Sequence, residues 1–299
     1  MPVDAFLLSW TVPSEDEGKT IKDYLKEKKI SKRALTDIKF AGGSILLNGD
    51  HATVRASLSA GDDLKVMFPP EEPSPGIVPE KMNLDIVYED EWCLVINKPP
   101  FVPTIPSREH PGGTLANGLL DYYSENGIAA TIHAVNRLDK DTSGLMLVAK
   151  HRFAHSLFSS MQKQGSIKRT YAALVEGALT EENGTIDAPI GRKEESIIER
   201  TVREDGQHAV THYKVLSSAE KYTLVTLRLE TGRTHQIRVH MAYIGHPLCG
   251  DSLYGGSRDL IRRQALHSRV LSFFHPLLEK EMTFEAEIPA DMQTVLKSL

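Results

Sequence analysis

The stretch AVNRLDKDTSGLMLVAK, residues 134–150, joins a short polar loop to an apolar run. The run has the length and composition of a buried β-strand, so the loop stands directly before a strand. Asp139 and Asp141 lie in the loop beside the cations Arg137 and Lys140. A nearby cation lowers the pKa of a carboxylate and orients it, and an attacking Asp must be ionised. The pattern allows a catalytic loop, and it equally allows a plain turn whose Asp and Ser side chains cap backbone amides.

On both sides of this stretch, short alternating segments are interleaved with helical patterns. Strands are expected in LDIVYED, WCLVINK, SGLMLVAK, TYAALVEG, VTHYKVL and YTLVTLRLE, and helices over residues 114–123, 153–164 and 234–244. Strands outnumber helices and follow one another in runs. This predicts an α+β fold with a mixed or antiparallel sheet, in a domain covering residues 84–299.

Residues 1–68 form a second predicted domain, of α/β type. A helix is expected in IKDYLKEKK, and another begins at Ser31, a good N-cap, and carries Lys32 and Arg33. An Asn-Gly pair at 48–49 then predicts a hairpin turn, followed by a further strand. This order resembles the small S4-like RNA-binding domain, which implies that Lys32 and Arg33 bind RNA. Residues 69–83, which hold five of the 16 prolines, read as a linker.

Composition bounds the possible functions. The net charge of -5 does not favour a polyanion partner, but residues 18–40 hold eight Lys or Arg against three acids, and residues 134–170 hold seven against two. These are two basic faces for a nucleic acid, or simply solvated helix faces. No apolar stretch approaches the roughly 18 residues of a membrane span, so a cytoplasmic location is expected. Cys93 and Cys249 belong to no CxxC pair, which argues against a disulfide framework or a thiolate metal site.

The loop NRLDKDTSGL, residues 136–145, resembles the signature of the RluA/RluD-type pseudouridine synthases. The resemblance implies an enzyme that isomerises uridines in RNA. It implies that Asp139 is the nucleophile and that Arg137 enters the RNA stack where the target base has left, with Thr142 in register on the substrate side. Asn136 stands where the family usually has His.

Further motifs follow in the order of that family. In KRTYAALVEG, the resemblance implies that Tyr171 packs against the flipped uracil, whereas its strand position alone indicates a core tyrosine. ETGRTHQIRVHMAYIGHPLCGD resembles the motif that supplies a basic partner to the nucleophile. Arg233, just before a helix expected to be capped by Thr234, is the candidate for the Asp139 ion pair, and Arg238 is the reserve candidate. QALHSRVLSFFHP resembles the closing motif and is expected to pack structurally.

One segment departs from the family pattern. INKPPFVPTIPS keeps Lys98 and Pro99 but has Phe101 where a Gly is expected, which predicts a bulkier loop.

The implied reaction needs no cofactor and no metal, and the sequence lacks GxGxxG and GxxxxGK[ST]. The expected partner is RNA, ribosomal RNA in preference to transfer RNA, and the protein is expected to be a monomer. A metal-dependent hydrolase is the rival enzyme class, raised by five histidines without an HExxH pattern: His235, His240, His246, His267 and His275. The other rival is a non-enzymatic RNA-binding or ribosome-assembly protein.

Overall fold

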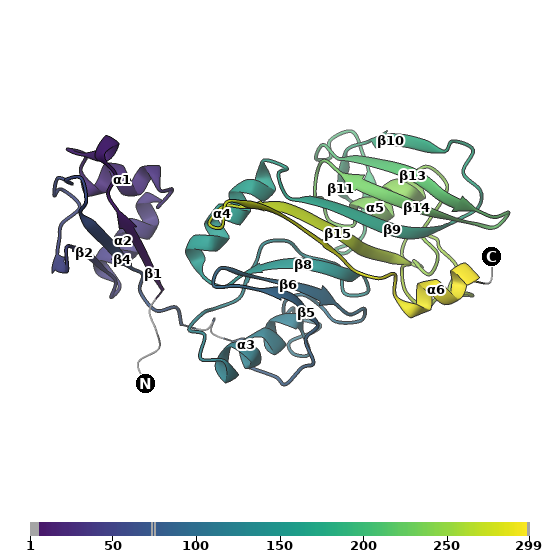
Figure 1. The fold of residues 1–299 in the computed structure, drawn as a ribbon. Coiled ribbons are helices and arrows are strands. Elements are labelled where there is room, and N and C mark those ends of the chain that lie inside the picture. The colour runs from purple at the N-terminus through teal and green to yellow at the C-terminus, as the bar shows by residue number, and fades with distance from the viewer. Residues whose placement is uncertain (1–5, 73, 75, 298–299) are drawn as a thin grey trace.

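The computed structural model describes residues 6–72, 74 and 76–297 (Figure 1). Residues 1–5 and 298–299 of the two predicted domains, and Pro73 and Pro75 of the predicted linker, lie outside the described residues. The elements follow in chain order: β1 Leu7–Thr11, a 3-10 turn Ser14–Asp16, α1 Ile21–Glu27, α2 Lys32–Phe40, β2 Ser44–Leu47, β3 Asp50–His51, β4 Asp63–Met67, β5 Ile86–Glu89, β6 Cys93–Lys98, α3 Leu115–Glu125, β7 His133–Ala134, β8 Ser143–Ala149, α4 Arg152–Lys163, β9 Lys168–Glu176, β10 Asn183–Asp187, β11 Ile190–Arg192, β12 Arg200–Val202, β13 Val210–Ser218, β14 Tyr222–Leu229, α5 Gln236–Tyr243, β15 Leu266–His275, β16 Lys280–Glu285 and α6 Ala290–Lys297.

The first sheet is antiparallel, in the order β1-β4-β2-β3, and α1 and α2 belong to the same unit. Ser31 caps α2 as predicted, since its hydroxyl accepts a hydrogen bond from the Ala34 amide. Asn48 and Gly49 both have positive φ, 53° and 92°, which confirms the predicted hairpin turn. Strand β1 was not predicted, because five residues with one short apolar run give too weak a pattern.

The second sheet has ten strands and fixes the α+β class. Its order is β10-β13-β14-β9-β15-β8-β6-β5, with β16 beside β15 and β7 beside β8. All its pairings are antiparallel except that of β15 with β8, so the sheet is mixed, which is one of the two forms predicted.

The central strands β6 and β8 are buried on both faces. Ile96 and Met146 belong to a cluster shared with α3 and α5, whereas Val95 and Leu147 belong to one shared with α4. Every residue of β8 is buried, which explains why its sequence is continuously apolar rather than alternating. The polar loop before β8 is therefore attached to the most rigid part of the sheet.

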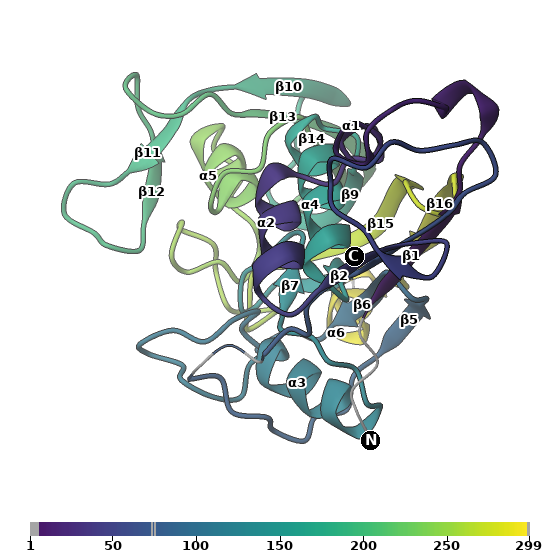
Figure 2. The same ribbon diagram turned by 90° about the vertical axis from the view of Figure 1, so that its left-hand side faces the viewer.

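The small sheet meets the large one at α4. Phe153 belongs to the apolar cluster of the small sheet, and Phe6 stacks on His151 with ring centroids 3.6 Å apart. On the rim, Arg152 pairs with Asp37 of α2 at 3.0 Å. The two cores are continuous at this point, and Figure 2 shows α2 beside α4.

The strands β11 and β12 form a separate hairpin that projects from the body of the large sheet (Figure 2). Between them, Ile197 and Ile198 are 79% and 48% exposed. None of the helices in the described ranges is long and apolar enough to cross a lipid bilayer.

Candidate active site

Asp139 lies in the loop between β7 and β8, and the loop begins a turn there, since the Thr142 amide donates to the Asp139 carbonyl at 3.1 Å. The loop runs into β8 at Gly144, which has φ +111°. A Cβ at Gly144 would lie 2.3 Å from the carbonyl oxygen of Ser268 on β15. Only glycine permits this close approach of β8 to β15, so Gly144 sets the position of the loop.

Three buried side chains hold the backbone of this loop. The Lys98 ammonium donates to the Lys140 carbonyl at 3.0 Å, and the Arg263 guanidinium to the Asp141 carbonyl at 3.2 Å. The Thr104 hydroxyl donates to the carbonyl of residue 138 at 2.8 Å. Lys98 and Arg263 are almost completely buried, so two cations fix the peptide units that flank the carboxylate.

Lys98 also donates to the carbonyls of Pro99 and Val102, at 2.9 and 2.8 Å. Burial lowers the pKa of Lys98 to about 7. Its three carbonyl acceptors favour the ammonium, because only the charged form carries three donors. Lys98 thereby organises the loop that holds Phe101, the position at which glycine was expected. Phe101 has φ +68°, and its side chain is 55% exposed.

The ion pair of Asp139 is made by Arg238, on the first turns of α5. Arg238 Nη1 lies 3.0 Å from Asp139 Oδ2, and the same guanidinium donates to both oxygens of Asp251 at 2.6 and 2.8 Å. Burial lowers the pKa of Arg238, but the two carboxylates outweigh it and raise the pKa above its ordinary value. The arginine therefore stays charged beside Asp139.

The predicted pair of Arg233 with Asp139 is wrong. Arg233 is exposed, and its Nε donates to the carbonyl of His208 at 2.9 Å. The helix also begins two residues later than expected, so Thr234 does not cap it. The Gln236 side chain folds back instead and accepts from the Arg233 amide and the Thr231 hydroxyl. This arrangement places position 238, one turn further on, against the loop.

A hollow of about 90 Å³ opens beside Asp139. Tyr171 lines it from β9 and is 3% exposed, with Arg169 Nη1 at 3.4 Å from its hydroxyl. Leu266 and Arg137 lie on the same wall. The carboxylate thus faces a space bounded by an aromatic ring, an aliphatic side chain and cations.

The remaining predicted binding residues lie in different surroundings. Arg137 is exposed and makes no side-chain hydrogen bond or ion pair within the part of the chain that the structure describes. Thr142 lines the hollow but is 2% exposed, and its hydroxyl accepts from Gln264 at 3.3 Å. Lys32 and Arg33 are exposed on α2, in the other unit. Asn136 is buried, and its side-chain oxygen accepts from the Leu147 amide.

His235 and Tyr254 were not predicted as members of the site. His235 Nε2 lies 3.8 Å from Asp139 Oδ2, and its Nδ1 lies 2.8 Å from the Tyr254 hydroxyl. Burial lowers the pKa of His235, against the attraction of the Asp139 charge. His235 stands in the motif around Arg238 and Tyr254 lies three residues after its end, but no spacing rule places a histidine at the start of a helix against a loop 96 residues earlier in the sequence.

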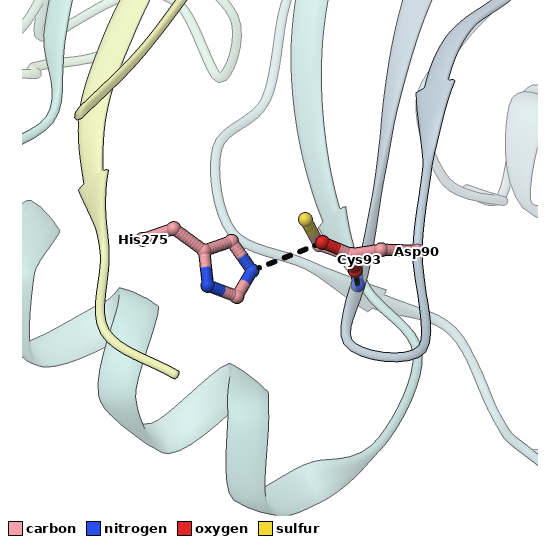
Figure 3. Close-up of side chains that lie close together, drawn as sticks. All are labelled: Asp90, Cys93 and His275. Atoms are coloured by element: carbon pink, nitrogen blue, oxygen red, sulfur yellow. Dashed lines mark hydrogen bonds and ion pairs between the residues drawn. The ribbon is translucent and has the colours of Figure 1, made fainter. Parts of the chain in front are cut away.

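The histidines that raised a metal site are scattered and mostly satisfied by protein partners. His240 contacts Thr211 and the Ala188 carbonyl, and His246 the Glu176 carbonyl. Within the described residues, the one group with metal-ligand chemistry is Asp90, Cys93 and His275, remote from Asp139 in the fold (Figure 3).

Asp90 is already engaged by the protein. Its Oδ1 accepts from the amides of Trp92 and Cys93, and its Oδ2 from the Tyr88 hydroxyl, with His275 Nε2 3.2 Å away. These contacts tie the turn between β5 and β6 to the end of β15. Internal hydrogen bonding accounts for the cluster.

Comparison with known proteins agrees with this geometry. Residues 93–243 match the family model described as RNA pseudouridylate synthase. The RNA pseudouridine synthase YjbO of Bacillus subtilis is 59% identical over 278 residues, 93% of this chain and 98% of that protein. The ribosomal large subunit pseudouridine synthase D of Xanthomonas campestris is 37% identical over 316 residues, covering 100% of this chain and 94% of that protein.

The fold of the large sheet is also that of a solved structure. The human RNA pseudouridylate synthase domain containing 1 superposes with a TM-score of 0.59 at 25% identity, over 72% of this chain and 94% of that chain. Fold, site and relatives define an isomerase that acts on RNA. The chain belongs to the RNA pseudouridine synthase family, which confirms the resemblance seen in NRLDKDTSGL.

Proposed function

We propose that the protein isomerises specific uridines of structured RNA with Asp139 as nucleophile. The ion pair of Asp139 with the buried Arg238, on the wall of a hollow that Tyr171 also lines, carries this proposal. The guanidinium at 3.0 Å holds the carboxylate in place. The Asp139 anion acts on the target nucleotide as its C1′–N1 bond breaks with the electron pair leaving on uracil.

The rest of the reaction balances without a co-reactant. A C1′–C5 bond forms, C5 loses a proton and N1 gains one, so there is no redox change and no group is transferred from outside. The base must first leave the helix, which requires a pocket for the ring and a group to fill the vacancy. Tyr171 bounds the pocket and stacks on the uracil. Arg137, exposed and unpaired among the described residues, fills the vacancy.

The substrate we propose is large-subunit ribosomal RNA. The support is the name of relatives that match almost the whole chain, the ribosomal large subunit pseudouridine synthases D. Residues 1–68 act as an S4-like domain, in which Lys32 and Arg33 on the exposed face of α2 contact phosphates. Binding through such contacts weakens steeply as salt rises.

The experiment is pseudouridine mapping of cellular RNA in a deletion strain complemented with wild-type protein, Asp139→Asn or Asp141→Asn. Asp139→Asn removes the anion at nearly constant shape, and Asp141→Asn makes the same change two residues away, where the carbonyl rather than the carboxylate is held by Arg263. We expect one or more sites to vanish on deletion and to return with wild type and Asp141→Asn only.

A non-enzymatic RNA-binding role makes the contrary prediction. If no site changes on deletion, or if Asp139→Asn restores every site, the catalytic assignment fails and the RNA-binding role replaces it. A scaffold has no use for a carboxylate paired with a buried arginine beside a hollow, which is why we favour the enzyme.

A further inference from the structure

His235 adopts a backbone conformation that its side chain does not favour. It precedes α5 with φ 58° and ψ 19°, the left-handed region, and its side chain makes no capping hydrogen bond. A residue with a Cβ is destabilised there by roughly 1 kcal/mol or more. The imidazole is nonetheless mostly buried, with 12% of its side chain exposed. Strain at a buried polar residue next to the nucleophile calls for a functional explanation.

The hydrogen bonds around His235 favour one position for its ring proton. The amide of Arg200, the first residue of β12, donates to the Tyr254 hydroxyl oxygen at 3.0 Å. The hydroxyl proton is then directed at His235 Nδ1, 2.8 Å away. With Nδ1 as acceptor, the neutral ring carries its proton on Nε2. That nitrogen is the one that faces Asp139.

The two donors near Asp139 approach one and the same oxygen. Arg238 Nη1 lies 3.0 Å and His235 Nε2 3.8 Å from Oδ2. Oδ1 accepts no hydrogen bond from the residues described. The contact from His235 is too long for a hydrogen bond and would become one on closing by about 0.8 Å.

We propose that His235 is a positioning residue of the isomerase: its Nε2–H closes on Oδ2 of Asp139 when RNA binds, and with Arg238 it leaves Oδ1 as the oxygen that acts on the nucleotide. This inference rests on the function proposed above. It also explains the left-handed backbone of His235, because this conformation places the imidazole beside the loop that carries Asp139.

The same contacts connect the site to the projecting hairpin. Tyr254 accepts a hydrogen bond from the amide of Arg200, where β12 begins after the turn of the hairpin, and Ile198 of that turn lines a hollow of about 250 Å³ together with Asp139, His235 and Arg238. RNA held by the hairpin therefore acts on Asp139 through Tyr254 and His235. In structures without substrate, catalytic hydrogen bonds are commonly long and tighten only when substrate is bound.

The decisive variant is His235→Gly, because glycine accepts φ 58° without strain and removes only the imidazole. With total ribosomal RNA from the deletion strain as substrate, we expect kcat to fall roughly ten- to hundred-fold, the value of one hydrogen bond to a charged group. KM should stay within about threefold, since no phosphate contact is lost. A structural role alone would move the melting temperature and not kcat.

Glu279→Gly is the matched control. Glu279 is exposed, has φ 52° and lies in the turn between β15 and β16, so the change relieves the same kind of strain away from the site. It should keep wild-type kcat. If His235→Gly also turns over within about twofold of wild type, the inference is wrong.

A second measurement does not depend on activity. ¹⁵N NMR of the imidazole in the free wild-type protein should show Nε2 protonated and Nδ1 unprotonated, and Tyr254→Phe should lose this preference. A proton on Nδ1 in the wild type would overturn the inference. Activity surviving Asp139→Asn in the same assay would overturn the proposed function instead, so the two failures are distinct.

Discussion

The loop that carries Asp139 and the hairpin β11–β12 line the same hollow, yet they are held in contrasting ways. Three carbonyls of the loop accept hydrogen bonds from Thr104, Lys98 and Arg263, which are all buried. The hairpin leaves Ile197 79% exposed at its turn. The contrast shows that the peptide units around Asp139 are fixed by buried side chains, whereas the turn of the hairpin keeps a large apolar side chain exposed.

The largest effect should come from breaking the loop's ion pair. Arg238→Met leaves the Asp251 carboxylate buried and unpaired, so the free energy of unfolding should fall by about 3–5 kcal/mol and activity should be lost. Arg233→Met, five residues earlier and exposed, should change stability by less than about 0.5 kcal/mol. Urea denaturation of the two variants checks this, and equal effects would contradict the assignment of the pair.

The next effect tests how the loop is placed. In Gly144→Ala the new Cβ meets the backbone of Ser268, which cannot yield without separating β8 from β15. We expect a loss of about 2–4 kcal/mol, from backbone strain and a disrupted core. Gly165→Ala has φ +68° but open space around it, so it should lose only about 1 kcal/mol. Thermal unfolding of the two variants separates the effect of the contact with Ser268 from the effect of backbone strain alone. Similar losses of stability in both variants would refute this account of Gly144.

A third prediction concerns the buried lysine. Lys98→Met leaves three carbonyls without their donor and should cost about 1–3 kcal/mol at pH 7. The pKa of Lys98 is about 7 in the folded chain and 10.5 when unfolded, so between these values the unfolded chain binds more protons. The contribution of Lys98 to the free energy of unfolding therefore rises from pH 7 to 10.5. Urea denaturation across that range should show that the free energy of unfolding of the wild type minus that of Lys98→Met rises with pH. A difference that does not change with pH would show that the pKa of Lys98 is not lowered.

The smallest effect on stability should come from the hairpin. Ile197→Ser combined with Ile198→Ser removes two exposed apolar side chains, so unfolding should change by less than about 0.5 kcal/mol. Affinity for ribosomal RNA should nevertheless fall severalfold, because the hairpin has this surface free for RNA. Fluorescence titration measures it, and Leu278→Ser, exposed elsewhere, serves as the control.

Much of the fold was accessible from the sequence because its signals are local. Ser31 as a cap, the Asn48-Gly49 turn and the apolar run of β8 each act over a few residues. The order of strands indicated the α+β class and left a mixed and an antiparallel sheet open. Register and the parallel contact of β15 with β8 did not follow from it, because they depend on strands about 120 residues apart.

Positions in the candidate site that belong to a recognisable sequence motif were predicted. Contacts between residues far apart in the sequence were missed. Asp139 and Tyr171 do line one hollow. Which arginine pairs with Asp139 depends on where α5 begins. The Gln236 side chain accepts from the Arg233 amide at the start of the helix, and the sequence did not reveal this contact. His235 could have been found only from the left-handed turn before the helix, and a sequence does not display that conformation.

The anchoring of the loop also fixes the order in which the protein can become functional as it is made. Arg263 holds the Asp141 carbonyl and is itself held at both ends of its guanidinium by Asp291 on α6. The loop is synthesised halfway along the chain, but its anchor is incomplete until residue 291 has been added, roughly 8–30 s later at the usual rate of about 5–20 residues per second. A nascent chain on the ribosome thus carries Asp139 well before the anchor of its loop is complete.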